Sequence, residues 1–253
     1  MEFNIIENKD LLPLHKIAMN ADGILAEDIK APLPKKSGFN MLINAPSGSG
    51  KTTFLINILN RKARNGVRQS LRRVFDSVII VSPTLGSLKN DIFADLEDKK
   101  KYKHFNSDML DGLDNILEEN EELREKEKRD IYTLLILDDV GTEIKRSKEE
   151  KRFNQIISNR RHLGGGGLSI ITLTQKFRDL PLNIRSNLTD AVFFAPKNNI
   201  EWNSIYEEFF PKSNKHKEEV YDFFFDKKYE FMWIKMATPP FEFYKGFDKV
   251  EMK

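Results

Sequence analysis

The sequence predicts an α/β fold built on a parallel sheet, and three observations support this prediction. Short apolar runs alternate with helical patterns over most of the chain, as in strands joined by crossover helices. The runs at 77–81 and 131–137 are largely apolar and include β-branched side chains, which is typical of strands buried on both faces. A glycine-rich segment at 45–52 joins the first apolar run to a helical pattern.

The first half of the predicted core holds two strands and two helices. An apolar run predicts a strand at 39–44, and helix-compatible spacing follows from 50 to about 64. The β-branched run at 77–81 predicts the second strand, which Pro83 ends because proline cannot extend a buried strand. The pattern at 108–128 predicts a helix that is apolar in its first half and densely charged in its second half.

The second half of the predicted core repeats this alternation. A buried strand is expected at 131–137 and a helix at 148–160. The glycines at 164–167 predict a flexible turn before the strand at 168–174, because no Lys-Ser/Thr pair follows them as in a phosphate loop. A short helix then leads to a fifth strand at 191–194.

Three regions are expected along the chain. Residues 1–36 are broken by prolines and are interpreted as an N-terminal arm able to pack on a neighbouring subunit. Residues 37–196 form the core, and residues 197–253 form an extension of helices and a β-hairpin. Within this extension, helices are predicted at 201–209 and 215–225. The alternating stretches at 230–234 and 241–244 predict an antiparallel pair of strands.

Composition narrows the classes of protein that remain possible. The chain has 253 residues, of which 40% are hydrophobic, and its formal net charge is +2. This near balance does not by itself indicate a nucleic-acid binder, so DNA contacts would have to come from local basic groups. The lack of cysteine excludes disulfides and Cys-ligated metal centres. With no apolar run long enough for a membrane helix and no secretory signal in residues 1–20, an intracellular protein without a membrane segment is predicted.

The glycine-rich segment has the pattern of a P-loop, which binds the phosphates of nucleotides. It comprises Ala45, Pro46, Ser47, Gly48, Ser49, Gly50, Lys51 and Thr52, and Thr53 follows. The N–H groups of such a loop and of the next helix converge on a polyphosphate. Lys51 supplies a charge for the β- and γ-phosphates, and the Thr52 hydroxyl is a ligand for Mg²⁺. Ala45 replaces the first glycine of the pattern, which is tolerated where φ is negative. A site for a nucleotide and Mg²⁺ is therefore predicted, and the nucleotide is ATP if the resemblance described below holds.

Polar residues at the ends of two strands add the parts that hydrolysis needs. Asp138 and Asp139 follow the strand at 131–137, at the carboxyl edge where the P-loop also lies. Asp138 is predicted to hold Mg²⁺ through its water shell, and Asp139 to orient or deprotonate the attacking water. Gln175 ends the strand at 168–174 and can reach the γ-phosphate or this water if its strand lies between the first and third. A plain strand cap or a surface glutamine is the alternative.

Arginines on either side of the Gln175 strand are candidates for a cation supplied in trans. Arg160 and Arg161 precede this strand in sequence, and Arg185 follows it. A cation from a neighbouring subunit can speed phosphoryl transfer by about 10³–10⁵-fold. Solvated helix ends are the alternative interpretation of these arginines.

Two basic groups can contact DNA phosphates without reading the sequence of the DNA. The first comprises Arg61, Lys62, Arg64, Arg68, Arg72 and Arg73, and the second comprises Lys99, Lys100, Lys101 and Lys103. A solvated helix face and loop is the alternative for both.

Taken in order, these motifs resemble those of viral genome-packaging ATPases of the FtsK/HerA superfamily. The similarity is to the poxvirus type, shared by large DNA viruses, virophages and Polinton-like elements, and it covers about residues 38–196. It implies an ASCE/RecA-like sheet with strand order 5-1-4-3-2, numbered along the chain. It also implies a homo-oligomeric ring, a pentamer or hexamer, that moves double-stranded DNA into a preformed capsid with a capsid or portal-vertex protein as partner. The expected location is the cytoplasmic assembly site of an infected cell, or the virion.

The sequence leaves open which residue is the base, and it leaves open two alternative functions. The second acid is often Glu in the superfamily, so Glu143 is an alternative to Asp139 as the base. A GTPase is disfavoured because no Asn/Thr-Lys-x-Asp motif follows the Asp-Asp-Val-Gly at 138–141. An AAA+-like helicase loader is the nearest enzymatic alternative. A scaffold that binds ATP without productive turnover is the alternative outside enzymes.

Overall fold

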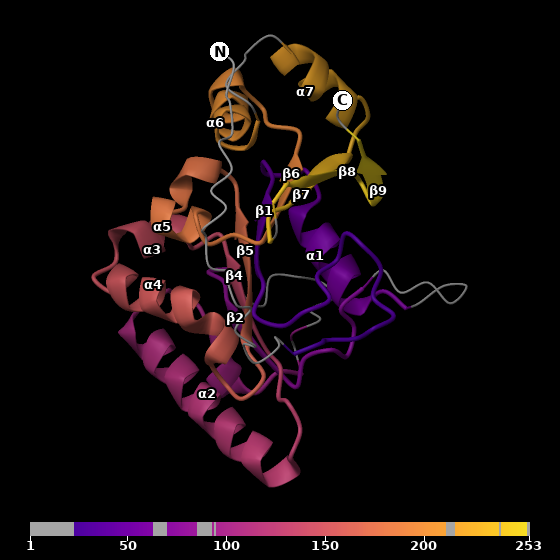
Figure 1. Ribbon diagram of the computed structural model, residues 1–253. Helices are drawn as coiled ribbons and strands as arrows, with labels where there is room; N and C mark the ends of the chain where they lie inside the picture. Colours follow the sequence, from indigo (N-terminus) through magenta and orange to yellow (C-terminus); the bar gives the residue numbers. More distant parts are fainter. Residues whose placement is uncertain are drawn as a thin grey trace, which may run out of the picture.

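The described part of the chain contains a nine-stranded sheet with helices on both faces (Figure 1). The structure is a computed structural model that describes residues 23–62, 70–84, 93, 95–210, 216–237 and 239–251. The strands are β1 (Asn40–Asn44), β2 (Ser77–Val81), β3 (Lys101–Tyr102), β4 (Thr133–Asp138), β5 (Leu168–Thr174), β6 (Asp190–Phe194), β7 (Phe231–Lys235), β8 (Glu242–Lys245) and β9 (Asp248–Val250). The predicted α/β fold class is confirmed.

The strands lie in the order β3-β2-β4-β5-β1-β6-β7-β8-β9 across the sheet. The first six strands in this order are parallel to one another. Without the two-residue strand β3, the parallel part reads 5-1-4-3-2 in the numbering of the five predicted strands. The expected order is therefore confirmed, and β5, which ends just before Gln175, lies between β1 and β4. In such a sheet the carboxyl ends of neighbouring strands meet at one edge, where ligands bind.

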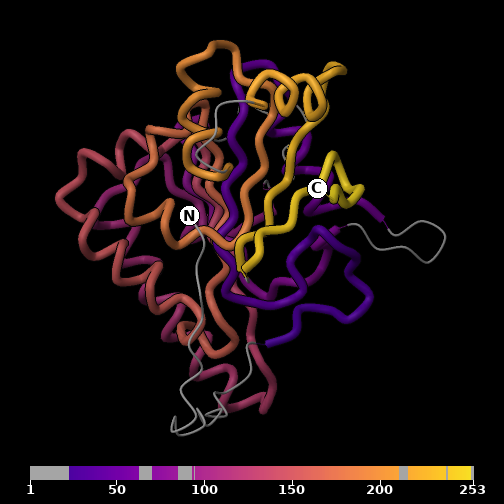
Figure 2. The backbone as a smooth tube through the Cα atoms, turned by 45° about the horizontal axis from the view of Figure 1, so that its top comes forward, coloured from indigo at the N-terminus to yellow at the C-terminus, as the bar shows by residue number. Residues whose placement is uncertain are grey.

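The C-terminal strands continue this sheet rather than forming a separate hairpin. Strand β7 pairs antiparallel with β6, β8 pairs with β7, and β9 pairs with β8. Figure 2 shows the result, with the yellow C-terminal strands beside the orange strand β6. The sequence predicted only two of these strands, because β9 is three residues long and two of them are charged.

Helices fill the crossovers and cover both faces of the sheet. The α-helices are α1 (Lys51–Asn60), α2 (Ser107–Glu127), α3 (Gly141–Arg146), α4 (Glu150–Asn159), α5 (Leu182–Arg185), α6 (Asn199–Phe209) and α7 (Lys217–Phe224). Short 3₁₀ turns lie at Asp98–Lys100, Arg160–His162 and Phe177–Asp179. The predicted helix at 50–64 ends earlier, at Asn60, and the sequence did not predict α3 as a separate helix.

The buried strands divide their side chains between two hydrophobic cores, as the two-residue period of a strand requires. In β1, Leu42 joins the core under α2 to α7, whereas Met41 and Ile43 join the core under α1. Residues 23–36 belong to the second core, where Ile29 and Leu33 are 0% and 1% exposed. This described part of the expected N-terminal arm therefore packs on its own subunit, and residues 1–22 lie outside the described residues.

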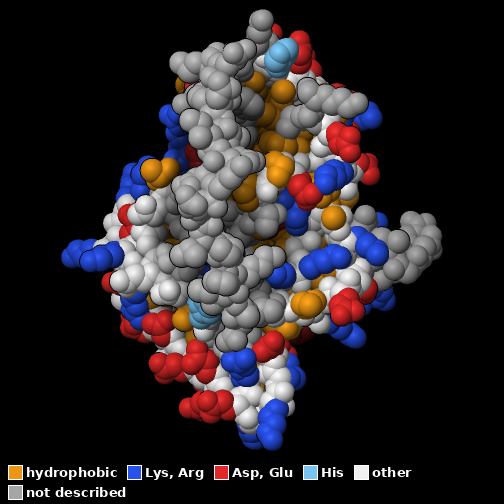
Figure 3. Space-filling model, viewed as in Figure 1, with side chains coloured by type: hydrophobic (Ala, Val, Ile, Leu, Met, Phe, Trp, Pro, Cys, Tyr) orange, Lys and Arg blue, Asp and Glu red, His pale blue; other side chains and the backbone are white. Residues whose placement is uncertain are grey.

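Helix α2 shows how charge patterning follows exposure. Its N-cap is Asn106, whose side chain accepts a hydrogen bond from the Met109 N–H, so the first turn is closed by a side-chain oxygen. The apolar first half packs in the core. The charged second half is mostly exposed, except at the buried Asn120, whose side chain donates to the Thr133 hydroxyl at 2.8 Å. On the face drawn in Figure 3, acidic and basic side chains gather at the lower end, where α2 lies.

No described helix combines the length and apolar character needed to cross a membrane.

Candidate functional site

The P-loop lies between β1 and α1, as the sequence predicts. Gly48 and Gly50 have φ values of 79° and 92°, in the left-handed region that glycine adopts without strain. Ala45 is fully buried, is not among the residues with positive φ, and donates its N–H to the Thr174 carbonyl at 3.0 Å. An alanine therefore fits the position where the P-loop pattern has its first glycine.

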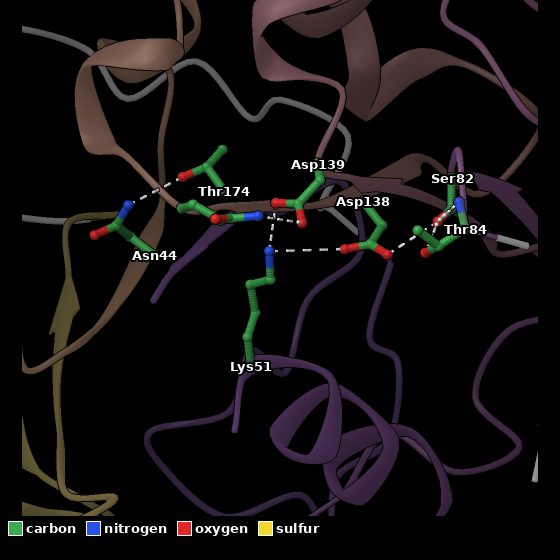
Figure 4. Close-up of polar contacts among 8 residues, drawn as sticks. Asn44, Lys51, Ser82, Thr84, Asp138, Asp139 and Thr174 are labelled. Carbon is green, nitrogen blue, oxygen red and sulfur yellow. Dashed lines mark hydrogen bonds and ion pairs between the residues drawn. The ribbon is translucent and has the colours of Figure 1, made fainter. Parts of the chain in front are cut away.

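Lys51 connects the P-loop to both acidic residues that follow the third predicted strand. Its side chain is only 9% exposed, its Nζ donates to Asp139 Oδ1, and it lies 3.9 Å from Asp138 Oδ1. Gln175 Nε2 donates to the other oxygen of Asp139 at 3.1 Å. Figure 4 shows Lys51 rising from α1 toward the two carboxylates at the end of β4. The four predicted groups therefore meet at one edge of the sheet.

Asp139 has an uncommon backbone conformation. Its φ is 55°, in the left-handed region, where Asp and Asn are among the few tolerated side chains apart from glycine. Its N–H donates to the Leu173 carbonyl at 3.0 Å, which ties the turn after β4 to the neighbouring strand β5. This turn directs the Asp139 carboxylate at Lys51 and Gln175.

Asp138 has the surroundings of a metal ligand. Its Oδ2 accepts a hydrogen bond from the Ser82 hydroxyl at 3.0 Å, whereas its buried Oδ1 has no hydrogen-bond partner. Burial raises the pKa of Asp138, and the nearby Lys51 ammonium and the Ser82 hydrogen bond oppose this rise. A buried carboxylate oxygen that accepts no hydrogen bond suits Mg²⁺, which prefers oxygen ligands. Asp138 therefore fits the metal role predicted for it, and Thr52 remains the other predicted ligand.

Glu143, the alternative base, is engaged elsewhere. Its Oε2 accepts a hydrogen bond from the Phe105 N–H at 2.9 Å, and its Oε1 lies 3.3 Å from His104 Nδ1. Both carboxylate oxygens therefore hold the segment that precedes α2. Among the described contacts, those to Lys51 and Gln175 involve Asp139 and not Glu143.

The three candidate arginines have different surroundings. Arg160 is 5% exposed, and its guanidinium donates to the carbonyls of Gly38 and Ile157, both at 2.7 Å. Arg185 pairs with Glu208 and lies 4.7 Å from the centre of the Phe177 ring. Arg161 is exposed. Arg160 and Arg185 therefore have structural partners within their own subunit.

Sequence reasoning missed several residues at the site. Ser82 directly follows β2. Its position at the carboxyl edge of the sheet could therefore have been predicted from the sequence. Asn44 donates to Thr174 at 3.1 Å and ties the ends of β1 and β5 together (Figure 4). Lys197 donates to the Ser47 carbonyl at 3.2 Å, a contact between residues 150 positions apart that no local pattern indicates.

A cavity of about 870 Å³ opens at the P-loop. Lys51, Asp139 and Gln175 line it on one side of β1. On the other side its walls include aromatic residues of the C-terminal part, namely Tyr229 just before β7, Phe231 in β7, and Phe247 in the turn between β8 and β9. Its volume falls within the range of about 300–1,000 Å³ that is common for small-molecule sites.

Comparisons with known proteins agree with this architecture. The family model described as "Poxvirus A32 protein" matches residues 30–217. The solved structure of B204, the DNA-packaging ATPase from Sulfolobus turreted icosahedral virus, is similar to the chain with a TM-score of 0.53 and 15% identity, over 83% of this chain and 98% of that one. The structure of B204 from Sulfolobus turreted icosahedral virus 2, in complex with sulfate, is also similar, with a TM-score of 0.50 and 18% identity. This similarity covers 83% of this chain and 96% of that one. A search of curated proteins gives no match.

Proposed function

The chain belongs to the Poxvirus A32 protein family, and from this premise we propose that it hydrolyses ATP to move double-stranded DNA into a preformed viral capsid. The family confirms the resemblance to viral packaging ATPases that the motifs indicate. The observation that carries the proposal is the convergence of Lys51, Asp138, Asp139 and Gln175 beside the P-loop. The proposed place of action is the assembly site in an infected cell, or the virion.

The contacts of Lys51 support a defined role for each group in hydrolysis. Lys51 forms an ion pair with Asp139. A bound triphosphate competes for this ammonium, and its transfer to the phosphates leaves Asp139 free to accept a proton from water. Gln175, already hydrogen-bonded to Asp139, is placed to orient the same water.

Magnesium is part of the proposal because the oxygen donors for it are present. Thr52 would hold it, together with Asp138 Oδ1, which accepts no hydrogen bond and would act through the ion's water shell. When bound, Mg²⁺ neutralises charge that develops on the β- and γ-phosphate oxygens.

Phosphate release with and without duplex DNA tests the proposed function against its two alternatives. Stimulation by blunt duplex DNA supports the motor. Tight ATP binding without release in either condition supports the non-hydrolysing scaffold. Turnover that responds only to a helicase partner, and not to duplex DNA, supports the AAA+-like loader.

DNA binding is expected to be independent of DNA sequence and strongly dependent on salt. The two basic groups at 61–73 and 99–103 are the candidates for this contact. Lys99, Lys100 and Lys101 pair with acidic side chains of their own chain, and Arg64 and Arg68 lie outside the described residues. Contacts to about six phosphates would weaken binding on the order of 10³-fold between 50 and 200 mM salt. Fluorescence anisotropy with two unrelated duplexes measures this dependence. A large preference for one duplex at equal salt would contradict the packaging proposal.

Arg161 is the best candidate for a cation supplied to a neighbouring subunit, on a geometrical argument. It precedes β5, whereas the P-loop follows β1, and these two strands are parallel neighbours. Seven residues of β5 separate the two edges of the sheet by about 20 Å. Arg161 therefore cannot reach the phosphates of its own P-loop, and an action on ATP would have to be in trans.

Mixing variants tests this assignment. Arg161→Ala is expected to bind ATP normally and lose about 10³-fold or more in turnover, because the cation stabilises the transition state. Mixed with Lys51→Ala protein, it should regain part of the activity, since some interfaces then pair an intact P-loop with an intact arginine. His162→Ala is the matched control, as an exposed neighbour expected to act like the parent. If activity does not recover at any mixing ratio, Arg161 is not the cation that acts on the ATP of a neighbouring subunit.

A further inference from the structure

The cavity at the P-loop extends beyond the phosphate site into an aromatic region. The acidic and amide groups enter from β4 and β5, on one side of β1. The aromatic groups come from the other side of β1, at the start of β7 and in the turn between β8 and β9. The P-loop therefore lies between a polar half and an aromatic half of one cavity.

Contacts among aromatic rings fix this half of the cavity to helix α1. Phe54, in the first turn of α1, contacts Phe231 with ring centres 4.8 Å apart and Trp233 at 6.1 Å. Phe231 in turn meets Phe247 edge to face at 5.6 Å. The helix that begins at the P-loop and the C-terminal strands are thus held together by one aromatic cluster, and the wall is placed before any ligand binds.

Tyr229 is the most unusual member of the wall. It is 58% exposed, although a large aromatic side chain is normally buried, and it lies next to Gly50 of the P-loop. Its φ is 70°, which is strained for a bulky aromatic residue. The Lys228 ammonium lies 4.8 Å from the centre of its ring. Backbone strain of this kind clusters at ligand-binding sites, where the surrounding structure compensates for it.

We propose that Tyr229, Phe231 and Phe247 form the binding site for the purine base of the nucleotide. This inference rests on the proposed function, because the triphosphate must occupy the P-loop for the base to extend along the cavity. Flat, two-ring bases stack on aromatic side chains, and each such contact contributes to binding without depending on hydrogen bonds. The C-terminal strands, which have no counterpart among the five predicted core strands, thereby complete the nucleotide site.

Comparing ATP with inorganic tripolyphosphate separates binding of the base from binding of the phosphates. Tyr229→Gly removes the ring and relieves the backbone strain at φ 70°, so the variant is expected to fold. It should bind ATP about tenfold more weakly in calorimetric titrations and bind tripolyphosphate as the parent does. Tyr229→Phe keeps the ring and should retain parental affinity for both. Phe241→Ala, an exposed aromatic outside the cavity, is the matched control.

A second variant and a second ligand keep the proposal open to contradiction. Phe247→Ala should reproduce the selective loss of ATP affinity. The preference of the parent for ATP over UTP should shrink in Tyr229→Gly, because a pyrimidine offers less stacking area. Equal weakening of ATP and tripolyphosphate by Tyr229→Gly, or no effect on either, would overturn the base site and leave the P-loop function intact. Failure of the parent to bind either ligand would overturn the proposed function itself.

Discussion

Replacing Lys51 by alanine is expected to lower ATP-dependent phosphate release by about 100-fold or more. The ammonium is the cation that the P-loop directs at the phosphates, and removing one preorganised charged donor costs about 10²–10³ in rate. The variant also loses the ion pair between Lys51 and Asp139. The adjacent carboxylates of Asp138 and Asp139 are then left without the cation that they share. ATP binding should therefore weaken together with turnover. Phosphate release and calorimetric ATP titration measure the two effects separately.

Lys197 provides the matched control for this experiment. Its ammonium also lies at the P-loop, but it donates to the Ser47 carbonyl at 3.2 Å. Lys197→Ala therefore removes a cation near the same loop while leaving the contacts of Lys51 with the carboxylates in place, and near-parental turnover is expected. Normal hydrolysis by Lys51→Ala would show that the P-loop is not the site of hydrolysis. Equal losses in both variants would mean that general positive charge at the loop, not the position of Lys51, matters.

The parts of the site that could be predicted are those that local sequence encodes. The P-loop is a contiguous segment, and its glycines at 48 and 50 occupy the left-handed conformations that the pattern requires. Asp138 and Gln175 were found because each follows a buried strand, and parallel strands bring their carboxyl ends together. The order of the strands was not encoded locally and came from the family resemblance, since pairing depends on contacts between distant segments.

The parts that could not be predicted depend on long-range packing. An arginine in sequence does not reveal whether its guanidinium is buried, and Arg160 proved to be a buried link to the Gly38 carbonyl. The aromatic wall joins residues of α1 to residues more than 170 positions later, such as Phe54 and Phe231. Residues 1–36 were interpreted as an arm able to pack on a neighbour, and Leu25, Ile29 and Leu33 of its described part lie in the second core of the chain. Isolated apolar residues among prolines give no periodic signal for such packing.

Asp139→Asn is expected to preserve ATP binding while lowering turnover by about 10²–10⁴-fold, the usual contribution of a general base. An amide cannot take the proton of the attacking water, but it fits the same space. Asparagine also tolerates the φ of 55° found at this position, so the turn after β4 should keep its shape. Because Lys51 would no longer pair with the carboxylate of residue 139, ATP should bind at least as tightly as to the parent. This combination of retained affinity and lost rate distinguishes a missing base from a damaged site.

Glu143→Gln decides between the two candidate bases. The amide of glutamine can still accept the hydrogen bond from the Phe105 N–H, which Glu143 Oε2 accepts at 2.9 Å, so the segment before α2 should remain in place. Turnover of Glu143→Gln is therefore expected to stay within about twofold of the parent, whereas Asp139→Asn stalls. Single-turnover phosphate release, measured for both variants at saturating ATP, isolates the chemical step from binding. The opposite pattern, a stalled Glu143→Gln and an active Asp139→Asn, would assign the base to Glu143. Its present contacts with His104 and Phe105 would then have to be exchanged when ATP binds.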